Sequence, residues 1–164
     1  MPETLIPLSP AAQRVQDALH GLGRDYRVLE LERSTRTSAE AAQAVGCRVG
    51  QIAKSLVFRR LASGRAALVI ASGANRVDEA RLAGLLSEPI GRASPDFVRE
   101  QTGFAIGGVP PVGHTTPLPI FIDEDLLLFD QIWAAGGTPH ALFALPSEDL
   151  PLLTGGQVAA LKAG

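Results

Sequence analysis

Lysine is scarce in this chain of 164 residues. Of its 15 basic side chains, 13 are Arg, and only Lys54 and Lys162 are Lys. Cysteine is scarcer still, because Cys47 is the single one, which excludes an internal disulfide and suits a reducing compartment. The chain also lacks any run of about 20 apolar residues, so it predicts no membrane span.

We expect no secretion signal either. The segment from Met1 to Pro10 contains acidic Glu3 and no basic residue, whereas a signal peptide begins with basic residues. We therefore expect a cytoplasmic protein. The net charge of −2 argues against binding nucleic acid through bulk electrostatics, although a local basic patch is compatible with it. Without a helix-turn-helix signature or a basic helix, we expect no DNA binding.

Length and composition favour one domain. A chain of 164 residues, 46% apolar and 20% charged, is long enough for a hydrophobic core and suits a single domain over residues 1–164. The 17 Gly and 12 Pro are spread without a period, which predicts many turns and short helices.

Cap residues and apolar alternation divide the chain into short elements. Helices are predicted to begin near Ser9-Pro10, Thr37, Asp78, Ser94-Pro95 and Ser147. Strands are predicted over residues 26–31, 52–58, 66–71, 120–122, 131–135 and 141–145. Because the late strands follow one another without a helix between them, we expect an α+β fold with a mixed sheet and flanking helices.

Lys54 interrupts the apolar strand predicted over residues 52–58. Successive side chains of a strand point to opposite faces, so Lys54 shares a face with Ile52, Leu56 and Phe58. A buried ammonium needs a partner, which a ligand phosphate or carbonyl would supply. The alternative is a Lys whose stem packs against the sheet while its head group reaches water.

Familiar catalytic motifs are absent: the chain has no G-x-S-x-G elbow, Walker loop, H-E-x-x-H pair or Cys pair. His20, His114 and His140 lie far apart and show no ligand spacing, so neither a metal nor a cofactor is predicted. The loop from Gly107 to His114 differs from its surroundings, because its glycines permit close backbone approach and its prolines stiffen the chain. It forms either the rigid wall of a site or an ordinary surface turn.

Taken in order along the chain, these motifs resemble those of the YbaK/ProX aminoacyl-tRNA deacylases. This superfamily includes free-standing editing proteins and the editing insertion domain of bacterial prolyl-tRNA synthetases. The resemblance extends from about Ala11 to Gly156. The segments that carry it are Thr37–Ala42, Gln51–Phe58, Ala93–Pro95, Thr102-Gly103, Gly107–Pro111, Ile122-Asp123 and Gly136-Gly137.

The resemblance implies a mixed, partly barrel-like sheet surrounded by short helices. It implies hydrolysis of the ester between a wrong amino acid and the terminal adenosine of a tRNA. The implied partners are the 3′ acceptor end of aminoacyl-tRNA and an aminoacyl-tRNA synthetase. The catalytic candidates are Lys54, Gly107 and Gly108. The substrate-binding candidates are Val109, Pro110, Pro111, Gly113, His114, Asp123 and Ser72.

Several roles stay open at this stage. His114 acts either as a general base or as a hydrogen-bonding cap of the loop. Asp123 either orders the active-site loop or a neighbouring backbone, or merely ends a strand. Ser72 and Asn75 either line the pocket or belong to the turn at Gly73.

The leading interpretation is a free-standing deacylase, and two alternatives remain. One is a module of the same fold that holds tRNA or a synthetase without chemistry, and the other is a hydrolase of a small ester or a free nucleotide. Ile106, Val109 and Phe104 flank the loop and favour a small apolar amino acid such as Ala. The candidates for phosphate contacts are Arg59, Arg60, Arg76 and Arg81.

Overall fold

The computed structural model describes residues 7–164. The segment from Met1 to Ile6, in which we expect no signal peptide, lies outside the described residues. The strands are β1 (Leu29–Glu30), β2 (Ile52–Arg60), β3 (Ala66–Ser72), β4 (Ile90–Arg92), β5 (Ile120–Asp123), β6 (Gln131–Ala135), β7 (Ala141–Pro146) and β8 (Gln157–Ala159). The helices are α1 (Pro10–Gly21), α2 (Ser38–Val45), α3 (Glu79–Leu86), α4 (Pro95–Thr102) and α5 (Asp149–Thr154), with 3₁₀ turns η1 (Val49–Gln51) and η2 (Glu124–Leu128).

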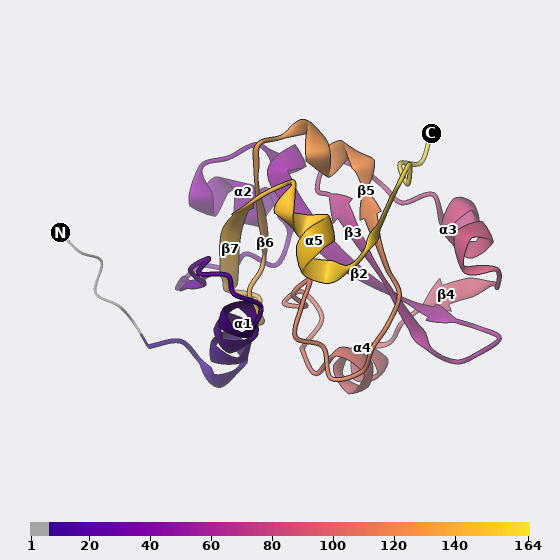
Figure 1. Cartoon of the computed structure of the whole chain (residues 1–164), viewed down its shortest axis with the longest axis horizontal. Helices are drawn as coiled ribbons and strands as arrows, with labels where there is room; N and C mark the ends of the chain where they lie inside the picture. Colours follow the sequence, from indigo (N-terminus) through magenta and orange to yellow (C-terminus); the bar gives the residue numbers. More distant parts are fainter. Residues whose placement is uncertain (1–6) are drawn as a thin grey trace.

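Within residues 7–164, eight strands form one mixed sheet with short helices around it (Figure 1). Their order is β1-β7-β6-β2-β3-β5-β8, and β4 pairs with β2 outside this series. Antiparallel pairs such as β2–β3 and β6–β7 lie beside the parallel pairs β2–β6, β3–β5 and β5–β8. The predicted α+β class and mixed sheet are confirmed. None of the helices among the described residues is long and apolar enough to cross a membrane.

Local hydrogen bonds explain where the helices begin and end. Thr37 accepts from the Glu40 backbone while Glu40 accepts from the Thr37 backbone, so the predicted capping box of α2 is present. Ser94 caps α4 by accepting from the Phe97 amide. Helix α4 ends at Gly103, whose φ of 83° is favourable only for residues that tolerate the left-handed conformation.

Two predicted caps are positioned or bonded differently. Ser9 occupies the cap position of α1, but its hydroxyl donates to Glu30 at 2.8 Å instead of capping the helix. Ser147 does not cap α5, because its hydroxyl donates to the Phe129 carbonyl and Glu148 takes the cap position. In both cases a partner distant in sequence competes with the local backbone for the hydroxyl.

The first predicted strand, residues 26–31, is mostly not a strand, because side-chain hydrogen bonds take the place of strand pairing. Only Leu29–Glu30 pairs as β1. Just before it, Gln16 of α1 donates to the Tyr26 carbonyl and accepts from the Val28 amide. These backbone groups therefore find their partners on a helix rather than on a strand. The short strands β4 and β8 were not predicted.

Strand β3 is buried along its whole length and separates two apolar clusters. Leu68 and Ile70 belong to the larger cluster, which includes residues of α1, β7 and α5. Val69 and Ala71 point to the other face, where Leu82 of α3 covers them. Because each fully buried aliphatic side chain contributes about 1.5–3 kcal/mol, this packing anchors the neighbouring strand β2.

Strand β2 has an opening along the edge that faces away from β3. On that edge β6 pairs with Ile52 and Ala53, and β4 pairs with residues 58–60. Between these two contacts, residues 54–57 have no strand partner on this edge among the described residues. A sheet edge left unpaired presents backbone donors and acceptors to whatever approaches it. Lys54 therefore lies at the start of this opening.

Candidate active site

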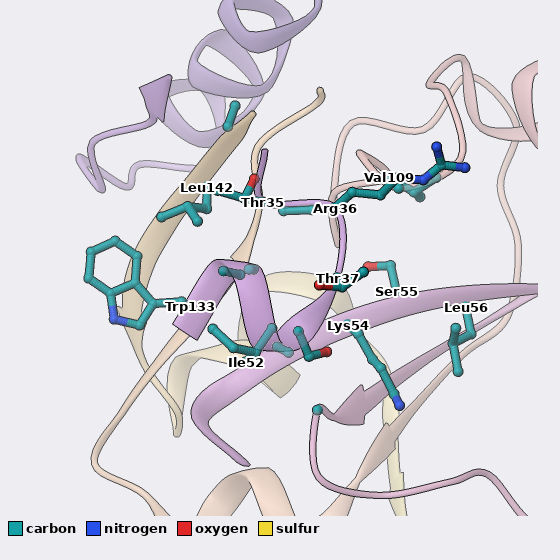
Figure 2. Close-up of a pocket in the computed structure, with 18 of the residues that line it drawn as sticks. Thr35, Arg36, Thr37, Ile52, Lys54, Ser55, Leu56, Val109, Trp133 and Leu142 are labelled. Atoms are coloured by element: carbon teal, nitrogen blue, oxygen red, sulfur yellow. The ribbon is translucent and has the colours of Figure 1, made fainter. Parts of the chain in front are cut away.

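A cavity of about 530 Å³ lies beside the opening in β2 (Figure 2). Four parts of the chain form most of it: the segment that leads into α2, the first half of β2, the loop after α4, and the strands β6 and β7. The lining residues are Thr35, Arg36, Thr37, Ser38, Ala41, Ile52, Ala53, Lys54, Ser55, Leu56, Gly73, Ile106, Gly107, Val109, Trp133, Ala134, Ala135, Ala141 and Leu142. Arg36 and Lys54 are cationic, and this lining contains no carboxylate.

Lys54 lies half-buried on the wall of this cavity. Its Nζ donates to the Asn75 carbonyl oxygen at 2.7 Å. Burial lowers the pKa of Lys54 from its usual value, and the nearby negative charge of Asp123 partly opposes that decrease. Figure 2 shows Lys54 and Ser55 leaving β2 in opposite directions. The ammonium is thus held by one neutral carbonyl, which leaves its other two donor hydrogens for a ligand.

Asp123 fixes the turn whose Asn75 carbonyl accepts the hydrogen bond from Lys54. Its carboxylate is 1% exposed and accepts from the Ser72 amide at 3.1 Å, from Asn75 Nδ2 at 2.9 Å and from the Asp125 amide at 3.0 Å. Asp125 also accepts from Asn75 Nδ2, at 2.8 Å. The carbonyl that receives Lys54 is therefore fixed by a buried carboxylate at the end of β5.

Ser72 and Gly73 complete that turn. The Ser72 hydroxyl donates to the Gly50 carbonyl at 2.8 Å, so it is engaged within the protein and does not line the cavity. Gly73 does line the cavity, and its amide donates to the Ile52 carbonyl at 2.7 Å. A Cβ at Gly73 would lie 2.5 Å from the Val49 carbonyl oxygen. The turn therefore approaches η1 more closely than any side chain allows.

The loop after α4 forms the facing wall through Ile106, Gly107 and Val109. Gly107 has φ of +88°, and a Cβ there would lie 2.9 Å from Cγ of Arg36. Gly108 donates to the Ala105 carbonyl at 3.0 Å and accepts from the Gly137 amide at 2.9 Å. A Cβ at Gly108 would lie 2.7 Å from the Thr138 backbone.

Other candidate residues of the loop lie elsewhere. Pro111, Gly113 and His114 line a separate hollow of about 350 Å³ beside Leu22 and Leu153, and Pro110 is buried. His114 Nε2 is 2.6 Å from the Pro110 carbonyl oxygen. Because a carbonyl only accepts, Nε2 carries the proton in this contact.

Burial lowers the pKa of His114, and its hydrogen bond to Pro110 opposes the decrease. The structure thus brings Lys54, Gly107 and Val109 together around one cavity and separates His114 from them. Among residues 7–164, no group of three or more His, Cys, Asp or Glu is arranged to hold a metal ion.

Sequence reasoning missed several lining residues. Thr35, Trp133 and Leu142 come from segments that no motif marked. Ser55 also lines the cavity, and its buried hydroxyl oxygen has no hydrogen-bond partner among the described residues. Its position next to Lys54 was the one available signal. Phe104, expected near the amino-acid pocket, is instead 1% exposed in the core, with the Arg14 guanidinium over its ring.

The four candidate phosphate-binding arginines have different surroundings. Arg60 lies 3.9 Å from Glu88, and the Arg59 guanidinium lies over the Phe97 ring. Arg81 is exposed on α3. Arg76 is exposed and lines a second hollow next to the main cavity.

Comparison with known proteins assigns this chain to a family. The aminoacyl-tRNA editing domain matches residues 32–152, which include β2, the Asp123 turn and the loop after α4. YwhH of Bacillus subtilis (strain 168), an uncharacterized protein, is 32% identical over 127 residues, which are 77% of this chain and 80% of YwhH.

Solved structures agree with this match. The crystal structure of a candidate trans-editing enzyme for prolyl-tRNA synthetase is 57% identical, with a TM-score of 0.91, over 96% of this chain and 100% of that one. A scaffold used for computational epitope grafting is 51% identical, with a TM-score of 0.90, over 96% of this chain and 99% of that one. The chain therefore belongs to the aminoacyl-tRNA editing domain family.

Proposed function

We propose that this chain is a deacylase that hydrolyses the ester between an amino acid and the 3′-terminal adenosine of a tRNA. The observation that carries the proposal is the half-buried ammonium of Lys54, positioned on the cavity wall opposite Gly107 and Val109. Membership of the editing-domain family supports the same reaction. We propose further that residues 1–164 act as one editing domain.

The reaction needs few protein groups, because an aminoacyl ester is already activated. A water oxygen bonds to the carbonyl carbon, and the bond from that carbon to the ribose oxygen breaks. The ribose oxygen takes a proton, which releases a free amino acid and a tRNA with its terminal hydroxyl restored. Lys54 stabilises the negative charge that develops on the carbonyl oxygen or lies on the adjacent phosphate.

The glycine loop orients the substrate in this proposal. Gly107 lines the cavity, so its backbone is within reach of a ribose hydroxyl or the attacking water. Both backbone polar groups of Gly108 already have partners, so we assign it to holding the loop against Gly137. Asp123 and Ser72 act one step further away, through the turn that carries the Asn75 carbonyl.

The amino acid that we propose is small. Ile106 and Val109 on the loop face Trp133 and Leu142 across an apolar part of the cavity. A pocket of this kind separates side chains by size, at about 1–3 kcal/mol for each methylene. The 57% identical relative is named for prolyl-tRNA synthetase, which supports tRNA-Pro as the nucleic-acid part of the substrate and that synthetase as a partner.

The test is deacylation of tRNA-Pro charged with Ala, Ser, Cys, Thr or 2-aminobutyrate. We expect hydrolysis of the smallest members, and its loss in Lys54→Ala. Lys162→Ala is the matched control, because Lys162 is the other lysine of the chain, is exposed and does not line the cavity. Binding of these tRNAs without turnover of any would contradict the deacylase proposal and support a binding module instead.

A further inference from the structure

A second hollow of about 430 Å³ adjoins the main cavity. The two share five lining residues, which are Lys54, Ser55, Leu56, Ile106 and Val109. The second hollow follows the same unpaired edge of β2 toward β4, away from the segment that leads into α2. The two hollows are therefore contiguous along β2, and one extended ligand can occupy both.

The far end of this hollow combines an aromatic ring with two cations. Phe58 follows Lys54 and Leu56 on one face of β2, and Arg92 of β4 is its cross-strand partner. Arg76 directly follows Asn75, whose carbonyl receives Lys54. Both arginines are exposed, and neither forms an ion pair with a carboxylate in the part of the chain that the structure describes.

The charge of the hollow opposes that of the whole protein. Its lining carries the cations Lys54, Arg76 and Arg92 against the single carboxylate of Glu79, whereas the chain has a net charge of −2. Because an acidic protein does not attract anions through its net charge, a local cluster of cations indicates a binding site for an anionic ligand. Cations beside a half-buried aromatic ring suit single-stranded nucleic acid, whose phosphates bind the cations and whose bases contact the ring.

We propose that the second hollow binds the nucleotide that precedes the terminal adenosine of the tRNA. Its base contacts Phe58, and its 5′ phosphate binds Arg76 and Arg92. The phosphate that joins it to the terminal adenosine then lies beside Lys54, which is the cation common to both hollows. This inference rests on the proposed function, because it takes the main cavity as the site of the aminoacylated adenosine.

Two unreactive ligands test the proposal by binding alone. Adenosine 5′-monophosphate carries the terminal nucleoside and one phosphate, whereas the 5′-phosphorylated dinucleotide pCpA adds the preceding nucleotide. Calorimetry gives both affinities, and Trp133, which lines the main cavity, gives a fluorescence signal for the same titrations. We expect pCpA to bind about tenfold more tightly than adenosine 5′-monophosphate.

The variants separate the second hollow from the first. Arg76→Ala combined with Arg92→Ala should bring the two affinities within about twofold and leave adenosine 5′-monophosphate binding unchanged. Phe58→Leu, which keeps an apolar side chain, should remove part of the same advantage. Arg65→Ala is the control, because Arg65 is exposed and lines neither hollow. Thermal melts confirm that each variant is folded.

Two results would overturn the inference: pCpA binding no more tightly than the mononucleotide in the wild-type protein, or equal weakening of both ligands in the double variant. The proposed function fails separately. If the wild-type protein hydrolyses no aminoacyl-tRNA yet binds pCpA through Arg76 and Arg92, the nucleotide site stands and the deacylase proposal does not. If it hydrolyses aminoacyl-tRNA but does not prefer pCpA, only the nucleotide site is wrong.

Discussion

The two parts of the cavity wall that include Gly73 and Gly107 are held in place by different means. On one side, the turn from Ser72 to Asn75 is fixed by side-chain hydrogen bonds to the buried carboxylate of Asp123. On the other side, the loop at Gly107 and Gly108 is fixed by the absence of side chains, because its backbone lies where a Cβ would collide with its neighbours.

This difference determines how each wall fails. A wall held by a carboxylate loses its position when the acceptor is removed, because buried donors are left without partners. A wall held by close backbone approach loses its position when any side chain is added, because the overlap forces the two segments apart. The first wall therefore does not tolerate loss of the Asp123 carboxylate, and the second does not tolerate a side chain at Gly108. Close approach also limits the first wall at Gly73, where a Cβ would lie 2.5 Å from the Val49 carbonyl oxygen.

The largest effect is expected at the group between the two walls. Lys54→Ala should reduce kcat/KM for the hydrolysed aminoacyl-tRNA about 100- to 1,000-fold, as for other losses of preorganised charge stabilisation. The fold should persist, because the ammonium is partly exposed and its burial opposes its charged form. Turnover close to that of the wild-type enzyme would contradict the role of Lys54 in charge stabilisation.

Removal of the carboxylate tests the first wall. Asp123→Ala leaves the Ser72 amide, Asn75 Nδ2 and the Asp125 amide short of an acceptor, so we expect a loss of about 2–4 kcal/mol in unfolding free energy. Urea unfolding measures it. Asp125→Ala is the matched control with a smaller expected loss, since Asp125 accepts from the same Asn75 but is less buried. Equal losses would contradict the central role of Asp123.

Addition of one methyl group tests the second wall. Gly108→Ala places a Cβ 2.7 Å from the Thr138 backbone, so we expect destabilisation by about 1–3 kcal/mol and weaker substrate binding. Gly84→Ala in α3 is the matched control, because a Cβ there meets nothing within 4 Å. That substitution should stabilise the protein by about 0.5–1 kcal/mol. A neutral Gly108→Ala variant would mean that the loop can shift freely.

The smallest effect concerns the far end of the loop. Because burial lowers the pKa of His114 below 6.5, the unfolded chain binds a proton that the folded protein does not, and stability falls as pH decreases through that range. His114→Gln should remove this part of the acid-side loss, measured by urea unfolding at about pH 5 and about pH 8. Its kcat/KM should stay near that of the wild-type enzyme, whereas a large loss would favour a general base.

Local features of the chain could be predicted from the sequence. The capping box at Thr37, the cap at Ser94 and the stop at Gly103 each depend on residues within one helical turn, and all three are present. The mixed sheet was predicted from the order of strands and helices. Lys54 was singled out because a charged residue in an apolar strand breaks a short, readable pattern.

The errors share a cause. Ser147 and the strand over residues 26–31 were misjudged because their polar groups bond to Phe129 and to Gln16, which are distant in sequence. The opening in β2 was equally hidden, since it exists only because β6 and β4 reach different parts of that strand.

The sequence by itself determined which residues are unusual: one lysine in a strand, adjacent glycines, and a strand-end aspartate. The tertiary structure alone decided which of them meet, because it joined Asn75 to Asp123 across 48 positions and placed His114 in a separate hollow. The physical reason is the distance along the sequence over which each interaction acts. Caps, turns and strand alternation act between residues a few positions apart, whereas a site assembled from several strands and loops exists only after the chain has packed around its core.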